Sequence, residues 1–249
     1  MTSSAHRQTI VQGLVSARRS RQAWSHGSGT PELGVDDAYA IQSGVASALG
    51  WFPDGPKAWK VGGHPLITAA PLPDVLVSPA RWNCSSPDGV LIEAELAFRL
   101  ADTPARPEDV LACIGAVCVS IELIGTRLSD GLSAPAHWKL ADQGVHAGLV
   151  AGSETPYAVC AHFSDADWRQ QRCSVVVNGR LELQGQGTHP SVNPLAALPW
   201  LVAHAAQHTG GLRAGDLITT GAWATLTVVP GDVVEVVFDR LGTARLTLT

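Results

Sequence analysis

The chain has 249 residues, of which 45% are hydrophobic and 16% charged, a composition typical of a compact protein with a sizeable core and not of a disordered one. Its formal net charge of −5 argues against a surface built for nucleic acid or an anionic membrane. The 5 cysteines are odd in number and lack CxxC spacing, so neither a disulfide framework nor a structural zinc cluster is expected, and a reducing compartment fits.

No targeting or membrane segment is expected. The first residues lack the apolar core of a signal peptide. The most apolar stretch, Val110 to Gly125, is too short to span a bilayer and carries Glu122. We therefore expect a cytoplasmic protein.

The N-terminal residues 1–56 are predicted to be α-helical. Residues 5–24 are amphipathic, with apolar and arginine-bearing sides. A turn region follows over 25–34. Asp36 is then a suitable N-cap for a second helix that Gly50 would end.

Lys60 is the first candidate for chemistry, within the segment Lys57 to Gly63. Apolar and small residues flank it, and the glycines, Gly62 among them, let backbone or ligand approach closely. A lysine in such a setting can act as a buried acid, base or charge partner. The alternative is a solvated lysine at the end of a strand.

Two carboxylates lie one residue apart in the apolar segment 91–98, which follows a proline-rich loop region with short extended pieces over 64–89. Because side chains alternate faces along a strand, Glu93 and Glu95 point the same way. Two acids side by side repel each other and resist burial. A bound cation or a solvated edge resolves that conflict, and this segment alone does not decide between them.

A third acid, Glu122, lies in the β-branched segment Val110 to Ile124, which is predicted to be one long strand. An acid in a buried strand is costly unless it is paired or bound to metal. Three carboxylates form a hard-oxygen set suited to Mg²⁺ or Mn²⁺. The alternative is that Glu122 pairs with Arg99 or Arg127 while Glu93 and Glu95 line a solvated edge.

The C-terminal half reads as hairpins around one helix. Asn178-Gly179 predicts a tight hairpin turn within 172–183. His189, in the loop that follows, is more simply a loop residue than a general base. Asn193-Pro194 predicts the start of a helix that runs to about His208, with His204 and His208 read as solvated. Residues 217–222 predict a strand entering a tight turn, and a closing hairpin follows over 233–248. No linker or repeat divides the chain, so residues 57–249 are expected to complete a single domain with the helical region.

Three segments, taken in this order, resemble one enzyme family: 92–98 (IEAELAF), 121–127 (IELIGTR) and 212–222 (LRAGDLITTGA). They are similar to the 2-keto-4-pentenoate hydratases and their sibling 4-oxalocrotonate decarboxylases, of the fumarylacetoacetase C-terminal-like fold. The resemblance covers nearly the whole chain. It implies an α+β fold: a mixed, largely antiparallel β-roll with outer helices, in a homo-oligomer.

The resemblance also implies a set of site residues. Glu93, Glu95 and Glu122 correspond to the ligands of Mg²⁺ or Mn²⁺. Lys60, in Lys60-Val61-Gly62, corresponds to the active-site lysine. Gly221 corresponds to a glycine near the substrate carboxylate, and Gly62 joins it as a candidate contact.

The chain departs from the family pattern in two places. Asp142 is kept and is a candidate to orient Lys60 or a water. The family's substrate-side serine is Val145 here, which can neither donate nor accept a hydrogen bond. His146, beside it, is a candidate to take over a polar role, against the alternative of a surface-loop histidine. Residues 75–81 lack an acid that the family carries near Ala80.

The expected activity is that of a metal-dependent hydratase that adds water to a small 2-hydroxydienoate or 2-oxo-4-enoate acid, as in the breakdown of aromatic compounds. The alternatives on the same metal site are a 2-oxo acid decarboxylase of the 4-oxalocrotonate type and an acylpyruvate hydrolase. An alternative of another class is a non-catalytic subunit that associates with a sibling decarboxylase or hydratase.

Overall fold

The computed structural model describes residues 2–25, 27, 32–63 and 66–249. Half of the predicted turn over 25–34, residues 26 and 28–31, lies outside the described residues. The helices of the described chain are α1 (Ser4–Ser20), α2 (Val35–Leu49), α3 (Ala136–Ala141), α4 (Asp165–Gln170) and α5 (Leu198–His208), with short 3-10 helices η1 (Pro107–Cys113), η2 (Gly131–Ser133), η3 (Gln143–Val145) and η4 (Tyr157–Val159).

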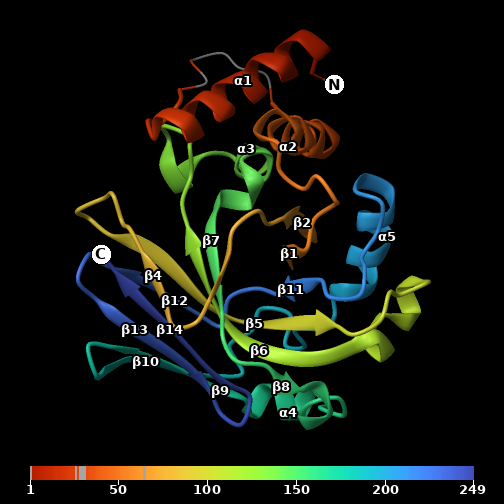
Figure 1. Ribbon diagram of the computed structural model, residues 1–249, viewed down its shortest axis with the longest axis vertical. Coiled ribbons are helices and arrows are strands. Elements are labelled where there is room, and N and C mark those ends of the chain that lie inside the picture. Colours follow the sequence, from red (N-terminus) through yellow and green to blue (C-terminus); the bar gives the residue numbers. More distant parts are fainter. Residues whose placement is uncertain (1, 26, 28–31, 64–65) are drawn as a thin grey trace.

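The strands form two sheets, and most neighbouring pairs are antiparallel (Figure 1). The larger sheet has the order β2-β1-β11-β5-β6-β7-β3, with β12 paired to β5 and β8 to β6. Its strands are β1 (Ala58–Gly62), β2 (Thr68–Pro71), β3 (Val75–Val77), β5 (Val90–Leu100), β6 (Ile114–Ile124), β7 (His146–Ala151), β8 (Thr155–Pro156), β11 (Leu217–Thr219) and β12 (Ala224–Val228). The smaller sheet has the order β10-β9-β13-β14-β4, built from β4 (Ala80–Trp82), β9 (Arg172–Val177), β10 (Arg180–Gln186), β13 (Val233–Phe238) and β14 (Gly242–Leu248).

Successive side chains of β5 and β6 point to opposite faces of the larger sheet, and these two faces differ in character. One face packs on the smaller sheet in the main hydrophobic core, with Leu96 and Phe98 from β5 and Val236 and Leu246 from the smaller sheet. The opposite face carries Glu93 and Glu95 and, further along, small buried residues such as Ala97. The apolar face therefore holds the two sheets together, while the other face holds the acids.

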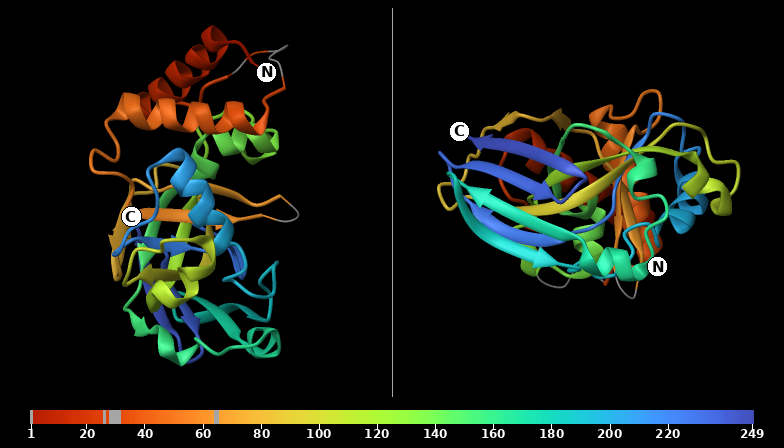
Figure 2. Two further views of the ribbon diagram at one scale, coloured as in Figure 1. Left: turned by 90° about the vertical axis from the view of Figure 1, so that its right-hand side faces the viewer. Right: turned by 90° about the horizontal axis from the view of Figure 1, so that it is seen from below.

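A separate hydrophobic cluster joins α1, α2 and α3 into a helical layer at one end of the molecule (Figures 1 and 2). Ile10 and Leu14 of α1 pack with Ile41 of α2 and Trp138 of α3. The helix α3 comes from the middle of the chain and is joined through η3 to β7, so this layer is tied to the sheet that carries the acids. Among the described residues, no helix combines the length and apolarity needed to cross a bilayer.

Several sequence predictions are confirmed. The mixed α+β fold with curled sheets and outer helices is the one found. Gly50 ends α2 with a φ of 68°. The Asn178-Gly179 hairpin joins β9 to β10, and both turn residues have positive φ, at 52° and 81°, as its tight turn requires.

Three element boundaries were predicted wrongly. The N-cap of α2 is Gly34, and Asp36 lies in the first turn of the helix, where its charge still suits the helix dipole. Residues 110–113 belong to η1 because β5 ends at Leu100, which pairs with Ile114, so the chain before Ile114 has no strand to pair with.

The third error concerns α5, which begins at Leu198, with Pro199 in its first turn, and not at Asn193. The Asn193 side chain instead accepts a hydrogen bond from the Leu195 backbone N–H, at 2.9 Å, in a separate turn. His204 is buried, contrary to the expectation of a solvated ring, because it stacks on Trp200 and packs on Tyr39 of α2. That burial, reinforced by His208, lowers the pKa of His204 to about 4.

Candidate metal centre

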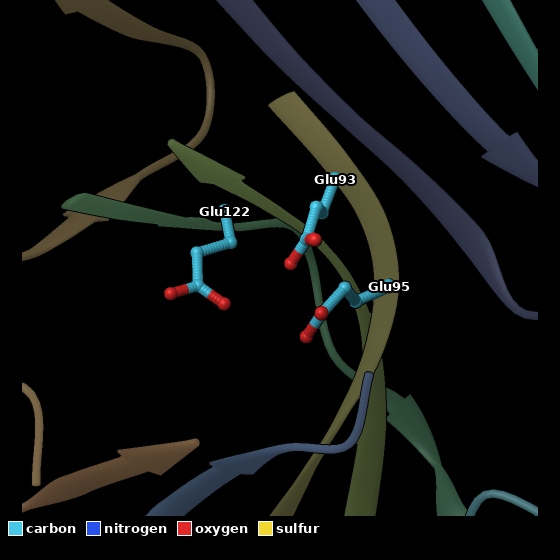
Figure 3. Close-up of side chains that lie close together, drawn as sticks. All are labelled: Glu93, Glu95 and Glu122. Atoms are coloured by element: carbon cyan, nitrogen blue, oxygen red, sulfur yellow. The ribbon is translucent and has the colours of Figure 1, made fainter. Parts of the chain in front are cut away.

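Three carboxylates meet on the face of the larger sheet that does not pack on the smaller one (Figure 3). In the antiparallel register of β5 and β6, Glu93 lies opposite Glu122, and Glu95 lies opposite Ser120. Each glutamate offers a carboxylate oxygen, and these oxygens all lie within 4.8 Å of one another. Glu95 and Glu122 are buried, and Glu93 is partly exposed. The two acids of one strand and the third acid of its neighbour are thus brought together as predicted.

The environment shifts the pKa of each of these acids. Burial, together with the nearby carboxylates of Glu122 and Glu93, raises the pKa of Glu95 well above its usual range. Burial also raises the pKa of Glu93, although Lys60 opposes this. For Glu122 burial acts in the same direction, but the Lys60 ammonium and the bond from His146 outweigh it, so its pKa is lowered. Of the three acids, only Glu122 accepts hydrogen bonds from Lys60 and His146, so its negative charge is the best compensated.

Lys60, on β1, supplies that compensation. Its Nζ donates to Glu122 Oε1 at 2.7 Å and to the Gly144 carbonyl oxygen at 3.1 Å. Burial would lower the pKa of Lys60, but the three glutamates raise it above its usual value, so the ammonium keeps its proton. The ion pair excludes the solvated-lysine alternative. The alternative pairing of Glu122 with Arg99 or Arg127 is also not found, since Arg99 pairs with Glu154 and Arg127 with Asp142.

The carboxylate trio fits a hard divalent cation. Three acids with one ammonium leave an excess of negative charge in a largely buried space, which a cation would neutralise. Among the described residues, Glu122 Oε2 is a buried oxygen without a hydrogen-bond partner. Oxygen ligands only, without sulfur or imidazole among the three, favour Mg²⁺ or Mn²⁺.

A left-handed turn presents the next site residues. Gln143, Gly144 and Val145 have φ values of 56°, 61° and 57°, between α3 and β7. Left-handed conformation costs a residue with a side chain about 1–2 kcal/mol, and a β-branched residue such as valine rarely adopts it. The turn brings the Gly144 carbonyl to Lys60, and it is followed by His146, whose Nδ1 lies 3.0 Å from Glu122 Oε1.

His146 is 2% exposed, so the alternative of a surface-loop histidine is wrong. Burial lowers its pKa, although Glu122 opposes this shift. The neutral ring therefore donates its Nδ1–H to the Glu122 carboxylate. Its Nε2 is buried and has no hydrogen-bond partner among the described residues.

Asp142 does not orient Lys60, in contrast to the sequence expectation. Its Oδ1 accepts from Arg127 Nε at 2.6 Å and from Arg18 at 3.2 Å, and its Oδ2 accepts from the Thr126 hydroxyl and the Arg127 backbone N–H. The reason is that Asp142 lies at the C-terminal end of α3, in the helical layer and before the left-handed turn. Asp142 thus anchors α1 and the end of β6 to the turn that carries the site.

Gly62 and Gly221 lie side by side. Both were predicted from the sequence as candidates for substrate contact. A Cβ added to Gly62 would lie 3.9 Å from the Gly221 Cα. Gly221 has a φ of 108°, and a Cβ there would lie 3.4 Å from His189 Nε2. His189 is buried, and its ring joins the Ser191 N–H at 3.3 Å to the Thr220 carbonyl at 2.8 Å. His189 therefore holds its loop against the Gly221 turn, and backbone groups occupy both ring nitrogens.

Two buried hydroxyl groups near the trio were not predicted. The Thr219 hydroxyl donates to Glu95 Oε2, and Ser120 Oγ lies 3.0 Å from Thr219 Oγ1. Both residues are fully buried. Ser120 precedes Glu122 by two positions in one strand, so alternation placed it on the same face, and this signal was present in the sequence.

Comparison with known proteins gives one family match and consistent relatives. The family model described as fumarylacetoacetate (FAA) hydrolase C-terminal matches residues 67–249. The chain is 27% identical over 239 residues to a 2-keto-4-pentenoate hydratase of Paraburkholderia xenovorans (strain LB400), and equally to 2-keto-4-pentenoate hydratase 3 of Pseudomonas putida. Each alignment covers 86% of this chain and 84% of the relative.

Solved structures share the fold. The 4-oxalocrotonate decarboxylase from Pseudomonas putida G7, complexed with magnesium and adipate, superposes with a TM-score of 0.83 at 20% identity, over 100% of this chain and 99% of that one. The fumarylpyruvate hydrolase from Pseudomonas aeruginosa, in complex with Mn²⁺ and pyruvate, gives a TM-score of 0.54 at 15% identity, over 77% of this chain and 88% of that one. The first match includes the helical layer, because it spans the whole chain.

Proposed function

The chain belongs to the fumarylacetoacetate hydrolase C-terminal family, and on this premise we propose that it is a divalent-metal-dependent hydratase acting on a small 2-hydroxydienoate or 2-oxo-4-enoate acid. The hydratases that it resembles over 86% of its length carry the activity named here. The reaction adds one water across a carbon–carbon double bond and yields a 4-hydroxy-2-oxo acid.

The observation that carries the proposal is the carboxylate trio with its single ammonium. Glu93, Glu95 and Glu122 offer oxygens within 4.8 Å of one another, and the one ammonium of Lys60, which hydrogen-bonds to Glu122, stands against three carboxylates. We propose that these acids hold Mg²⁺ or Mn²⁺. Such a cation supplies a Lewis acid for the carboxylate and 2-oxo oxygens of the substrate.

The residues around the trio supply binding and proton transfer. Lys60 keeps its proton beside Glu122, so it can neutralise negative charge that develops on the 2-oxo oxygen or pass a proton at Nζ to the substrate. Gly62 and Gly221 leave room where side chains would intrude, so backbone groups can approach the substrate carboxylate.

A decarboxylase of the 4-oxalocrotonate type is the second candidate, favoured by one observation. Val145 stands where the hydratases of the resembled family have a serine, and its side chain cannot orient water by a hydrogen bond. An acylpyruvate hydrolase is a third possibility on the same metal site. Product analysis separates the three, since water addition, release of carbon dioxide and carbon–carbon cleavage leave different molecules.

The test begins with metal-free protein and candidate 2-oxo and 2-hydroxydienoate acids. We expect turnover only after Mg²⁺ or Mn²⁺ is added, with the 4-hydroxy-2-oxo acid as product. Glu95→Gln should abolish both metal binding and turnover while the fold persists. Full activity in that variant, or in the presence of excess chelator, refutes the proposal.

A non-catalytic subunit is the alternative of another class. It predicts tight metal binding without turnover of any 2-oxo acid, and activity only in a sibling enzyme that binds this chain. The proposal also includes a homo-oligomer in the cytoplasm, and light scattering of the purified protein measures its assembly state.

A further inference from the structure

His146 contacts the carboxylate trio without belonging to it. Its Nδ1 lies 3.0 Å from Glu122 Oε1, the same oxygen that accepts from Lys60 Nζ at 2.7 Å. Two donors therefore converge on one oxygen of Glu122. The other oxygen, Oε2, receives no hydrogen bond from the described residues.

We propose that His146 is a positioning residue for Glu122: its Nδ1–H fixes Oε1 and so leaves Oε2 for the divalent cation. The inference rests on the proposed function, since it assumes that Glu122 binds metal. It changes the role expected for His146 from the sequence, which was contact with the substrate. Residues that orient a metal ligand through a hydrogen bond fix its geometry and tune its affinity.

Two costs at this position support a specific role. The Nε2 of His146 is buried without a hydrogen-bond partner among the described residues, which an apolar side chain of similar size would avoid. The turn before it holds Gln143 and Val145 at positive φ, which favours glycine. Both costs are explained if the turn must deliver an Nδ1–H to Glu122 and a carbonyl to Lys60.

Alternative explanations make different predictions for substituted side chains. If only the bulk of the ring matters, leucine should replace histidine without loss of metal affinity. If the Nδ1–H matters, asparagine should serve, because its amide nitrogen lies about as far from the backbone as Nδ1. Glutamine carries its amide nitrogen one bond further out, near the position of Nε2, and should not serve.

The experiment is a titration of metal-free protein with Mn²⁺. Calorimetry measures the affinity, and the electron paramagnetic resonance spectrum reports the environment of the bound Mn²⁺. We expect one site in the wild type, nearly unchanged affinity in His146→Asn, and affinity weakened by about 10- to 100-fold in His146→Gln and His146→Leu. His204→Asn is the matched control, because His204 is also buried but lies in the aromatic cluster of α5, and it should bind Mn²⁺ like the wild type.

The possible results distinguish a failure of the positioning role of His146 from a failure of the proposed metal-dependent function. Wild-type binding together with equal weakening in His146→Asn and His146→Leu overturns the positioning role and leaves the proposed function standing. Unweakened binding in His146→Leu or His146→Gln does the same. A wild type that binds no Mn²⁺ overturns the proposed function, and this inference with it. Should His146→Leu fail to fold, as circular dichroism would reveal, the contrast between asparagine and glutamine still decides.

Discussion

Replacing Glu95 by glutamine should stabilise the metal-free protein and remove its ability to bind metal. Glu95 is 1% exposed, and its pKa is raised well above the usual range by burial and by the carboxylates of Glu122 and Glu93. At neutral pH the folded protein must either keep a buried charge there or take up a proton. A neutral amide of the same shape avoids both costs.

The electrostatic repulsion that Glu95→Gln relieves can be calculated from the separation of the carboxylates. Two unit charges 4.8 Å apart interact by about 3.5 kcal/mol at an effective dielectric constant of about 20. Glu95 faces two like charges and one opposing ammonium, at Lys60, so neutralising it relieves about 3 kcal/mol in the folded state.

The pH dependence has a defined sign. The pKa of Glu95 is higher in the folded than in the unfolded protein. Its destabilising effect on the folded state is therefore absent below the unfolded pKa, about 4.3, and grows as pH rises toward the folded pKa. The advantage of Glu95→Gln should therefore be larger at pH 8 than at pH 5 and should shrink toward zero near pH 4.

The assay is urea denaturation of chelator-treated protein at these pH values, repeated at pH 8 with saturating Mg²⁺. The wild type should gain about 2.7 kcal/mol when Mg²⁺ is present at 100 times its dissociation constant, and Glu95→Gln should gain little. Glu32→Gln, at an exposed acid, is the control and should behave like the wild type. If Glu95→Gln is the less stable protein at pH 8 without metal, or keeps the full Mg²⁺ effect, the electrostatic reasoning is wrong.

Three further substitutions test the other parts of the site. Lys60→Met should lower kcat by at least about 100-fold in steady-state kinetics, while calorimetry shows that Mn²⁺ binding is retained, since a cation is removed from beside the ligands. Asp142→Asn should cost about 3 kcal/mol in urea denaturation, because the Arg127 and Arg18 charges lose a buried partner; unchanged stability contradicts the anchoring role. Gly221→Ala should lower the free energy of unfolding by about 1–3 kcal/mol, because of the φ of 108° at this position, and should raise KM. An unchanged KM in the folded variant would show that this turn does not contact the substrate.

The identities of the acids could be read from the sequence because strand geometry is local. One-residue spacing puts Glu93 and Glu95 on one face in any strand, and an isolated acid in an apolar segment marks Glu122 as unusual. The order of three short motifs then indicated the fold, which the structure confirms. The roles of these residues in metal binding and catalysis stay predictions.

Other features depended on which segments the fold brings together. No local rule tells that Glu122 pairs with Lys60 across 62 positions of sequence, or that Asp142 pairs with Arg127 and Arg18. The burial of His204 was missed for the same reason, since Tyr39, which covers it, comes from a distant helix.

The sequence by itself determined which groups are candidates for the site: three carboxylates and one lysine on strands, where the alternation of side chains follows from backbone geometry, and two glycines. Only the tertiary structure decided how their charges are shared, because a charge interaction depends on distance and burial, which sequence spacing does not report across strands. It leaves the buried carboxylate of Glu95 unfavourable, stabilises the charge of Glu122 through Lys60 and His146, and pairs Asp142 with Arg18 of the helical layer and with Arg127 after β6.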